Sequence, residues 1–119
     1  MGSTLAEKLL ARHAGLPQVR AGDLVVAGVT FAMVHDARAP NTIRMVEKMG
    51  AKSLPFAHKT AWVLDHFSPP PTIEAAQGHT AMRKFADEHG SVLYDIGDGI
   101  CHQVLPEGGH LTCGDLIVG

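Results

Sequence analysis

A carboxylate and a histidine stand together at the end of the most apolar run of this chain. The run is residues 60–64, and Asp65 and His66 follow it directly. A carboxylate beside an imidazole can fix the tautomer of the ring and raise its pKa, which suits a proton donor or acceptor. In the competing interpretation Asp65 only caps the following loop and His66 is merely exposed. The dipeptide alone leaves both interpretations open.

Two more histidines occupy similar places along the chain. His35 and Asp36 end an earlier apolar run, and His102 follows the glycine-rich loop 95–99. In open α/β sheets, working groups gather at the carboxyl ends of the strands. We therefore expect His35, His66 and His102 to converge on one rim of a sheet. For His102 the alternative is a place at the edge of a helical turn that packs on the core.

The apolar pattern predicts alternating helices and strands that would position these residues. Thr4 and Glu7 form a capping box for a first helix, which we expect to end at Gly15. This alternation favours a three-layer α/β/α domain with a largely parallel sheet, spanning residues 1–119. Strands are predicted at 24–27, 29–34, 60–64, 91–94 and 116–118, and further helices at 39–49, 72–89 and, as a single turn ended by a proline, 100–105.

The composition fits one globular domain and argues against several classes of function. The chain has 119 residues, 45% of them hydrophobic and 18% charged, which is wrong for a disordered protein. The formal net charge of −2 gives no basic field for nucleic acid or for an anionic membrane. No apolar run approaches the roughly 20 residues of a membrane span. Two cysteines make no disulfide framework, so we expect a cytoplasmic protein.

The two cysteines also raise the question of a metal site. Cys101, His102, His110 and Cys113 could be written as the four ligands of a zinc ion. They lack the paired C-x-x-C knuckle that zinc sites usually have, and two ordinary thiols explain them better. We therefore predict no metal ligand in this chain. The remaining histidines are predicted to be surface residues: His13, His58, His79, His89 and His110.

Several segments are more specific than single residues. Residues 63–67 (VLDHF), 99–107 (GICHQVLPE) and 114–119 (GDLIVG) are the most distinctive, and 4–8, 22–26 and 34–36 follow the same order and spacing. Together they resemble the aconitase family of hydro-lyases, in particular the large subunits of 3-isopropylmalate dehydratase and homoaconitase. The resemblance covers nearly the whole chain.

The resemblance implies a hydro-lyase that isomerises a hydroxy di- or tricarboxylic acid, of the 3-isopropylmalate or homocitrate type, by dehydration and rehydration. It implies that Asp65 and His66 form a carboxylate–imidazole pair near the leaving hydroxyl, which His66 helps to protonate. His102 resembles a second active-site histidine of the family.

The substrate-binding loop of the family overlies the segment that begins at His35. The resemblance thus implies substrate-binding roles for His35, Asp36 and Arg38. Many relatives have Gly, Thr and Gly where residues 37–39 of this chain are Ala, Arg and Ala. At this departure, Arg38 offers a guanidinium that could bind a carboxylate of the substrate.

A four-iron–four-sulfur cluster and a separate small subunit are implied for the full-length enzyme. In the family, residue 119 would be followed by an Asp-Ser-His-Thr motif, and the three cluster cysteines come later still. We therefore expect an amino-terminal fragment that binds no cluster and is inactive alone. A second hypothesis is a stand-alone, non-catalytic binding or assembly module. The exposed final strand is also a predicted site of self-association.

Overall fold

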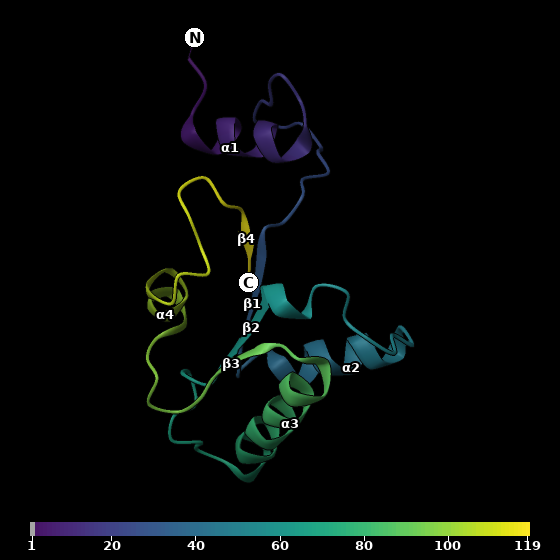
Figure 1. Cartoon of the computed structure of the whole chain (residues 1–119), viewed down its shortest axis with the longest axis vertical. Helices are drawn as coiled ribbons and strands as arrows, with labels where there is room; N and C mark the ends of the chain where they lie inside the picture. Colours follow the sequence, from purple (N-terminus) through teal and green to yellow (C-terminus); the bar gives the residue numbers. More distant parts are fainter. Residues whose placement is uncertain (1) are drawn as a thin grey trace.

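The computed structural model describes residues 2–119 and confirms the predicted α/β class. Four strands form one sheet in the order β3-β2-β1-β4, and each neighbouring pair is parallel. Helices α2 and α3 lie on one side of this sheet and α4 on the other (Figure 1). The elements are α1 (Leu5–Ala14), β1 (Phe31–His35), α2 (Ala39–Lys48), the 3₁₀ turn η1 (Ala57–Lys59), β2 (Thr60–Val63), α3 (Ile73–His89), β3 (Val92–Tyr94), α4 (Cys101–Glu107) and β4 (Ile117–Val118).

The alternation of side chains along β2 divides the core into two layers. Ala61 and Val63 face α4 and belong to one buried cluster. Trp62 and the following Leu64 face α2 and α3 and belong to the other. The Trp62 ring meets Phe85 of α3 edge-on, with ring centroids 5.1 Å apart. Both faces of β2 are therefore covered, which explains why its sequence is continuously apolar.

The ends of α1 and α3 are set by residues that the sequence identifies. The Thr4 hydroxyl accepts a hydrogen bond from the Glu7 backbone N–H, and the Glu7 carboxylate accepts one from the Thr4 N–H. Thr72 caps α3 in the same way, through the backbone N–H three residues on. Gly15 and Gly90 end these helices with φ of 65° and 69°, a left-handed conformation that glycine adopts without a steric penalty.

Residues 24–27 are the place where a predicted strand is wrong. Among the described residues this segment pairs with no strand, and the side chains of Leu24 and Val26 are 101% and 93% exposed. A short apolar run has the same pattern whether or not a neighbouring strand is present, so pairing cannot be read from the run itself. The predicted turn at 100–105 is also longer than expected, because α4 continues through Pro106 to its last residue, Glu107.

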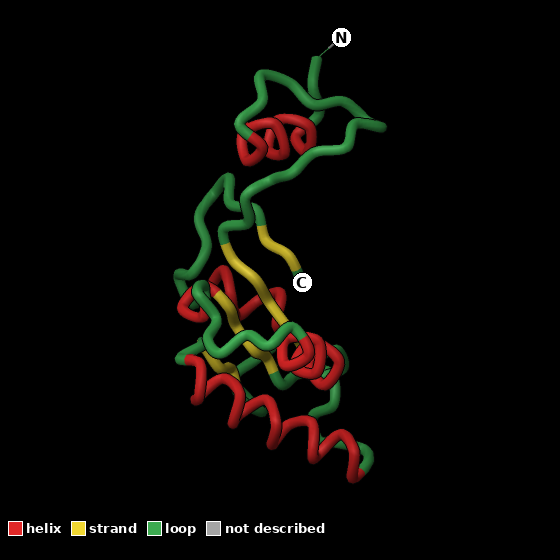
Figure 2. Tube along the Cα trace, turned by 90° about the vertical axis from the view of Figure 1, so that its right-hand side faces the viewer, coloured by secondary structure: helices red, strands yellow, loops and turns green. Residues whose placement is uncertain are grey.

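Residues 4–30 form an arm that stands away from the three layers (Figure 2). The His13 ring fastens this arm, since Nδ1 lies 2.8 Å from the Gly28 carbonyl oxygen and Nε2 lies 2.8 Å from that of Gly114. His13 is half-buried, and so is His89 at the end of α3, so neither is the freely exposed surface residue that was predicted. The arm makes the molecule long, with a radius of gyration of 16.3 Å, whereas a compact domain of this length has about 13.5 Å.

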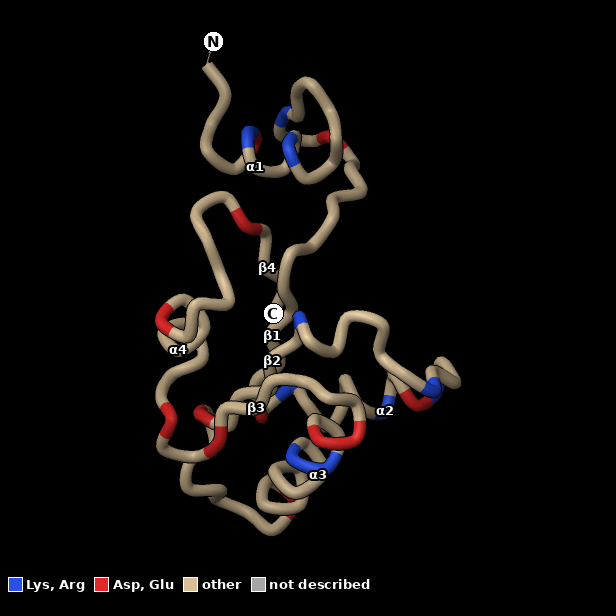
Figure 3. The backbone as a smooth tube through the Cα atoms, in the orientation of Figure 1, with Lys and Arg blue, Asp and Glu red and all other residues tan. Residues whose placement is uncertain are grey.

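The charged residues are distributed without a dominant sign. Over the described residues, Lys and Arg are interspersed with Asp and Glu (Figure 3). The best-defined ion pair joins α3 to the loop after β3, where Arg83 bonds Asp95 through Nε at 2.7 Å and Nη2 at 2.6 Å. This guanidinium holds the pKa of Asp95 at about 2. None of the helices within residues 2–119 has the length and apolar character needed to cross a membrane.

Candidate active site

Three histidines line one cavity beside α4. His35 ends β1, His66 follows β2 by three residues, and His102 lies in the first turn of α4. The cavity has a volume of about 340 Å³, and most of its other lining residues are apolar, such as Met33 and Leu105. A volume of this order suits a small organic ligand. The structure thus brings together the three imidazoles that the strand ends predicted.

Asp65 and His66 form a hydrogen-bonded pair at this cavity. Asp65 Oδ1 lies 2.7 Å from His66 Nδ1, and Oδ2 accepts a hydrogen bond of 2.8 Å from the backbone N–H of Cys101. Burial opposes ionisation of Asp65, but the Cys101 N–H and the His66 ring outweigh it and hold the pKa of Asp65 below its ordinary value. The ionised carboxylate therefore accepts the Nδ1–H of His66, and Nε2 is left as the nitrogen for chemistry. Asp65 also bonds the first backbone N–H of α4, which is a different contact from the predicted capping of the loop that follows Asp65.

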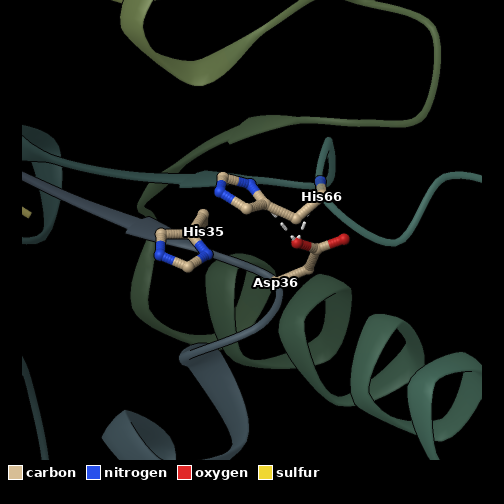
Figure 4. Close-up of side chains that lie close together, drawn as sticks. All are labelled: His35, Asp36 and His66. Atoms are coloured by element: carbon tan, nitrogen blue, oxygen red, sulfur yellow. Dashed lines mark hydrogen bonds and ion pairs between the residues drawn. The ribbon is translucent and has the colours of Figure 1, made fainter.

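His35 lies flat against His66 (Figure 4). The two ring centroids are 3.9 Å apart and the planes differ by 15°. Burial, and next the neighbouring His66, lower the pKa of His35. Nδ1 of His35 is buried without a hydrogen-bond partner among the described residues. His35 is therefore a neutral ring that supports one face of His66.

Asp36 does not face the cavity. Its side chain is 0% exposed and accepts hydrogen bonds from the backbone N–H groups of His66, at 3.1 Å, and Phe67, at 2.8 Å. The same carboxylate lies 3.0 Å from Nε2 of His79. Direct substrate binding by Asp36 stays a prediction, and the fully buried carboxylate reaches a ligand only through the loop that it holds.

Arg38 is the third residue of the predicted substrate-binding loop. It occupies the N-cap position of α2, where its side chain makes no capping hydrogen bond, and it is exposed. It is not among the residues that line the cavity of the three histidines. Carboxylate binding by Arg38 therefore stays a prediction. Arg38 does not line the cavity, but its side chain is not prevented by burial from meeting a ligand.

The cysteines of this chain do not fit an iron–sulfur cluster. Cys101 is fully buried, and Sγ lies 3.1 Å from Nδ1 of His102. Burial, with the nearby Asp65 carboxylate, raises the pKa of Cys101 to about 11, so the thiol is protonated at neutral pH. Cys113 is exposed. A cluster with one open iron needs three thiolates, and the described residues offer a single exposed thiol and a single buried one.

The four residues of the zinc hypothesis do not assemble either. His110 lies with Nε2 2.8 Å from the Tyr94 hydroxyl and is half-buried, contrary to its prediction as a surface residue. Within residues 2–119, two other groups have ligand atoms close together: His35, Asp36 and His66, and Asp65, His66 and Cys101. In the first group both Asp36 oxygens already accept backbone N–H bonds, and the second group contains the protonated thiol. Neither is a good metal site.

Sequence reasoning missed His79, which was predicted to be a surface residue. It lies on α3 with an exposure of 2%. A signal was present, because His79, Met82 and Ala86 are spaced by three and seven residues and so share one helical face. All three are buried. The helical period therefore identifies His79 as a core residue, although it does not identify Asp36 as its partner.

Comparison with known proteins gives relatives along the whole chain. The 3-isopropylmalate dehydratase large subunit 1 of Methanopyrus kandleri is 46% identical over 120 residues, and the large subunits of Methanoregula boonei and Aquifex aeolicus are 41% and 40% identical. Each comparison covers all of this chain and 28% of the relative, so the chain spans little more than a quarter of the length of these proteins. No protein-family model matches. The chain belongs to the aconitase family and corresponds to the amino-terminal part of 3-isopropylmalate dehydratase large subunits.

Proposed function

We propose that this chain supplies part of the active site of a hydro-lyase that isomerises a hydroxy di- or tricarboxylic acid by removing and re-adding water. The observation that carries the proposal is the Asp65–His66 pair, which shares one cavity with His35 and His102. The names of the relatives favour a substrate of the 3-isopropylmalate type. A homocitrate-type substrate is the related alternative.

His66 is proposed as the proton donor to the leaving hydroxyl. As the bond between carbon and this oxygen breaks, Nε2 of His66 gives its proton to the oxygen, which departs as water. The reverse addition returns the proton to Nε2. The ionised Asp65 carboxylate, at 2.7 Å from Nδ1, stabilises the imidazolium and fixes the ring. The base that removes the carbon-bound proton is not assigned to this chain.

His102, His35 and Arg38 are proposed as the residues around the substrate. Nδ1 of His102 lies against the Cys101 thiol, so its Nε2 is the nitrogen that can reach a ligand. The neutral His35 ring forms part of the cavity wall and supports His66. Arg38 offers a guanidinium, the group best suited to a carboxylate.

The proposed complete enzyme has parts that this chain does not contain. Its four-iron–four-sulfur cluster would take all of its thiolates from other residues, because Cys101 is buried and protonated. A separate small subunit is proposed as the partner. Within such an enzyme the present residues would bind the substrate and hold or deliver the proton at Nε2 of His66.

A hybrid large subunit tests this proposal. In it, the present chain replaces the matching amino-terminal part of the Methanopyrus kandleri large subunit, and the protein is purified anaerobically with its small subunit. We expect dehydration of 3-isopropylmalate, followed through the ultraviolet absorbance of the new double bond. His66→Ala should reduce the rate by about 10²–10⁴-fold, the usual contribution of a general acid.

The matched control is His58→Ala, an exposed histidine in η1 that does not line the cavity. It should leave the rate within about twofold, as surface substitutions do. A folded hybrid that is inactive with an intact His66 would favour the non-catalytic module. A rate that His66→Ala and His58→Ala change equally would remove His66 from the proposed role.

A further inference from the structure

We propose that His79 is a positioning residue for His66, and that it acts through the buried carboxylate of Asp36. This inference rests on the proposed function only because that function makes His66 the proton donor. It concerns a residue of α3 that is not among the residues lining the cavity and that faces the Asp36 carboxylate.

Three separate elements meet at the Asp36 carboxylate. Asp36 follows β1, His66 and Phe67 begin the loop after β2, and His79 lies on α3. Oδ1 accepts from the His66 N–H, and Oδ2 accepts from the Phe67 N–H and faces Nε2 of His79 at 3.0 Å. Figure 4 shows the carboxylate beside His66 at the start of this loop, with α3 below it in the view. One side chain thus ties the loop of His66 to both of its neighbours.

Burial makes each of these hydrogen bonds important. The Asp36 side chain is 0% exposed and that of His79 is 2% exposed, so water does not replace a lost donor. A buried carboxylate is tolerated only when its oxygens are bonded, because removing an anion from water is costly. His79 is itself held by the core face of α3, where Met82 is fully buried. The helix therefore fixes His79, His79 fixes Asp36, and Asp36 fixes the backbone of the loop.

This chain of contacts ends at the His66 ring. Nδ1 of His66 is 3.9 Å from Oδ1 of Asp36, too far for a hydrogen bond, so Asp36 makes its hydrogen bonds to the backbone of the loop and not to the ring. With the backbone fixed, the ring meets Asp65 at 2.7 Å and stacks on His35. Releasing the loop would loosen both contacts, and Asp65 would no longer select the tautomer that leaves Nε2 toward the ligand.

Nitrogen-15 spectra of the imidazoles test this on the 119-residue chain without any substrate. In the unaltered chain, at a pH where the ring is neutral, we expect His66 to carry its single proton on Nδ1. His79→Leu, which fills the space but donates no hydrogen bond, should leave His66 exchanging between its two tautomers. The amide protons of His66 and Phe67 should also lose exchange protection by about tenfold or more, the effect of losing a buried hydrogen bond. His79→Gln, which places an amide N–H at a similar reach, should restore both signals.

Two further variants keep the outcome decisive. Phe85→Leu changes the same buried side of α3 at a side chain that can make no hydrogen bond to Asp36, so it should lower the stability and leave both signals of His66 unchanged. Asp36→Asn changes no volume and should reproduce His79→Leu. It carries the test alone if His79→Leu does not fold. If His79→Leu and Asp36→Asn behave like Phe85→Leu, the positioning role is wrong. The tautomer and the exchange protection are measured without any enzymatic activity, so an inactive hybrid large subunit would not change the outcome of this test.

Discussion

Two aspartate–histidine pairs meet at the loop after β2, and they differ in exposure. In the outer pair, Asp65–His66, the histidine side chain is 42% exposed. In the inner pair, Asp36–His79, both side chains are enclosed. The closest contacts are similar, at 2.7 and 3.0 Å. The comparison shows that exposure of the histidine to the cavity, more than its pairing with an aspartate, decides what each pair can do. The open pair can exchange a proton with a ligand, and the closed pair can only hold backbone.

The largest expected effect comes from removing the inner carboxylate. Asp36→Ala leaves two backbone N–H groups and the buried His79 without their acceptor, so the free energy of unfolding should fall by about 3–5 kcal/mol. His66→Ala, which removes a half-exposed ring, should cost about 1 kcal/mol or less. Urea unfolding of the 119-residue chain measures both. Equal losses from the two variants would end the distinction between an inner and an outer pair.

The thiol behind the outer pair gives the second prediction. Burial and the Asp65 carboxylate keep Cys101 protonated, whereas Cys113 is exposed. In the folded chain at neutral pH, a thiol reagent should label Cys113 at least about 100-fold faster than Cys101, because the thiolate is the reactive form and Cys101 is shielded. Cys113→Ser should abolish rapid labelling, and unfolding should restore one reactive thiol. Rapid labelling of folded Cys113→Ser would show that the cavity side of α4 is open.

The smallest expected effect belongs to an ion pair outside both histidine pairs. Arg83 and Asp95 are 40% and 43% exposed, so solvent screens them and Asp95→Asn should cost about 1 kcal/mol or less at pH 7. The pKa of Asp95 is lowered from 3.8 to about 2 in the folded chain. A lowered pKa gives stability that is present above the unfolded value and is lost as the pH falls through the folded one.

Unfolding measured between pH 5 and about pH 2 checks this sign. The difference in unfolding free energy between the unaltered chain and Asp95→Asn should shrink over that interval. A difference that stays constant, or grows on acidification, would contradict the proposed effect of Arg83 on Asp95.

Much of the fold and the outer pair could be predicted because their signals are local. The continuous apolar run 60–64 predicts a strand buried on both faces, and parallel strands bring their carboxyl ends to one rim. The inner pair joins residues 43 positions apart, and no local pattern links them. Residues 24–27 show the same limit, because their apolar run carries no information on whether a neighbouring strand exists.

The central claim is that Asp65 prepares His66 for proton transfer, and Asp65→Asn in the hybrid large subunit tests it most directly. The amide keeps the size of the carboxylate but has one acceptor oxygen for two donors, the Cys101 N–H and the His66 Nδ1–H, and no negative charge to stabilise a positive ring. We predict that kcat falls by about 10³-fold or more while KM changes little, as when a catalytic imidazole loses its aspartate. A kcat within about tenfold of the unaltered hybrid would contradict the claim, because a general acid that needs its carboxylate loses more than that.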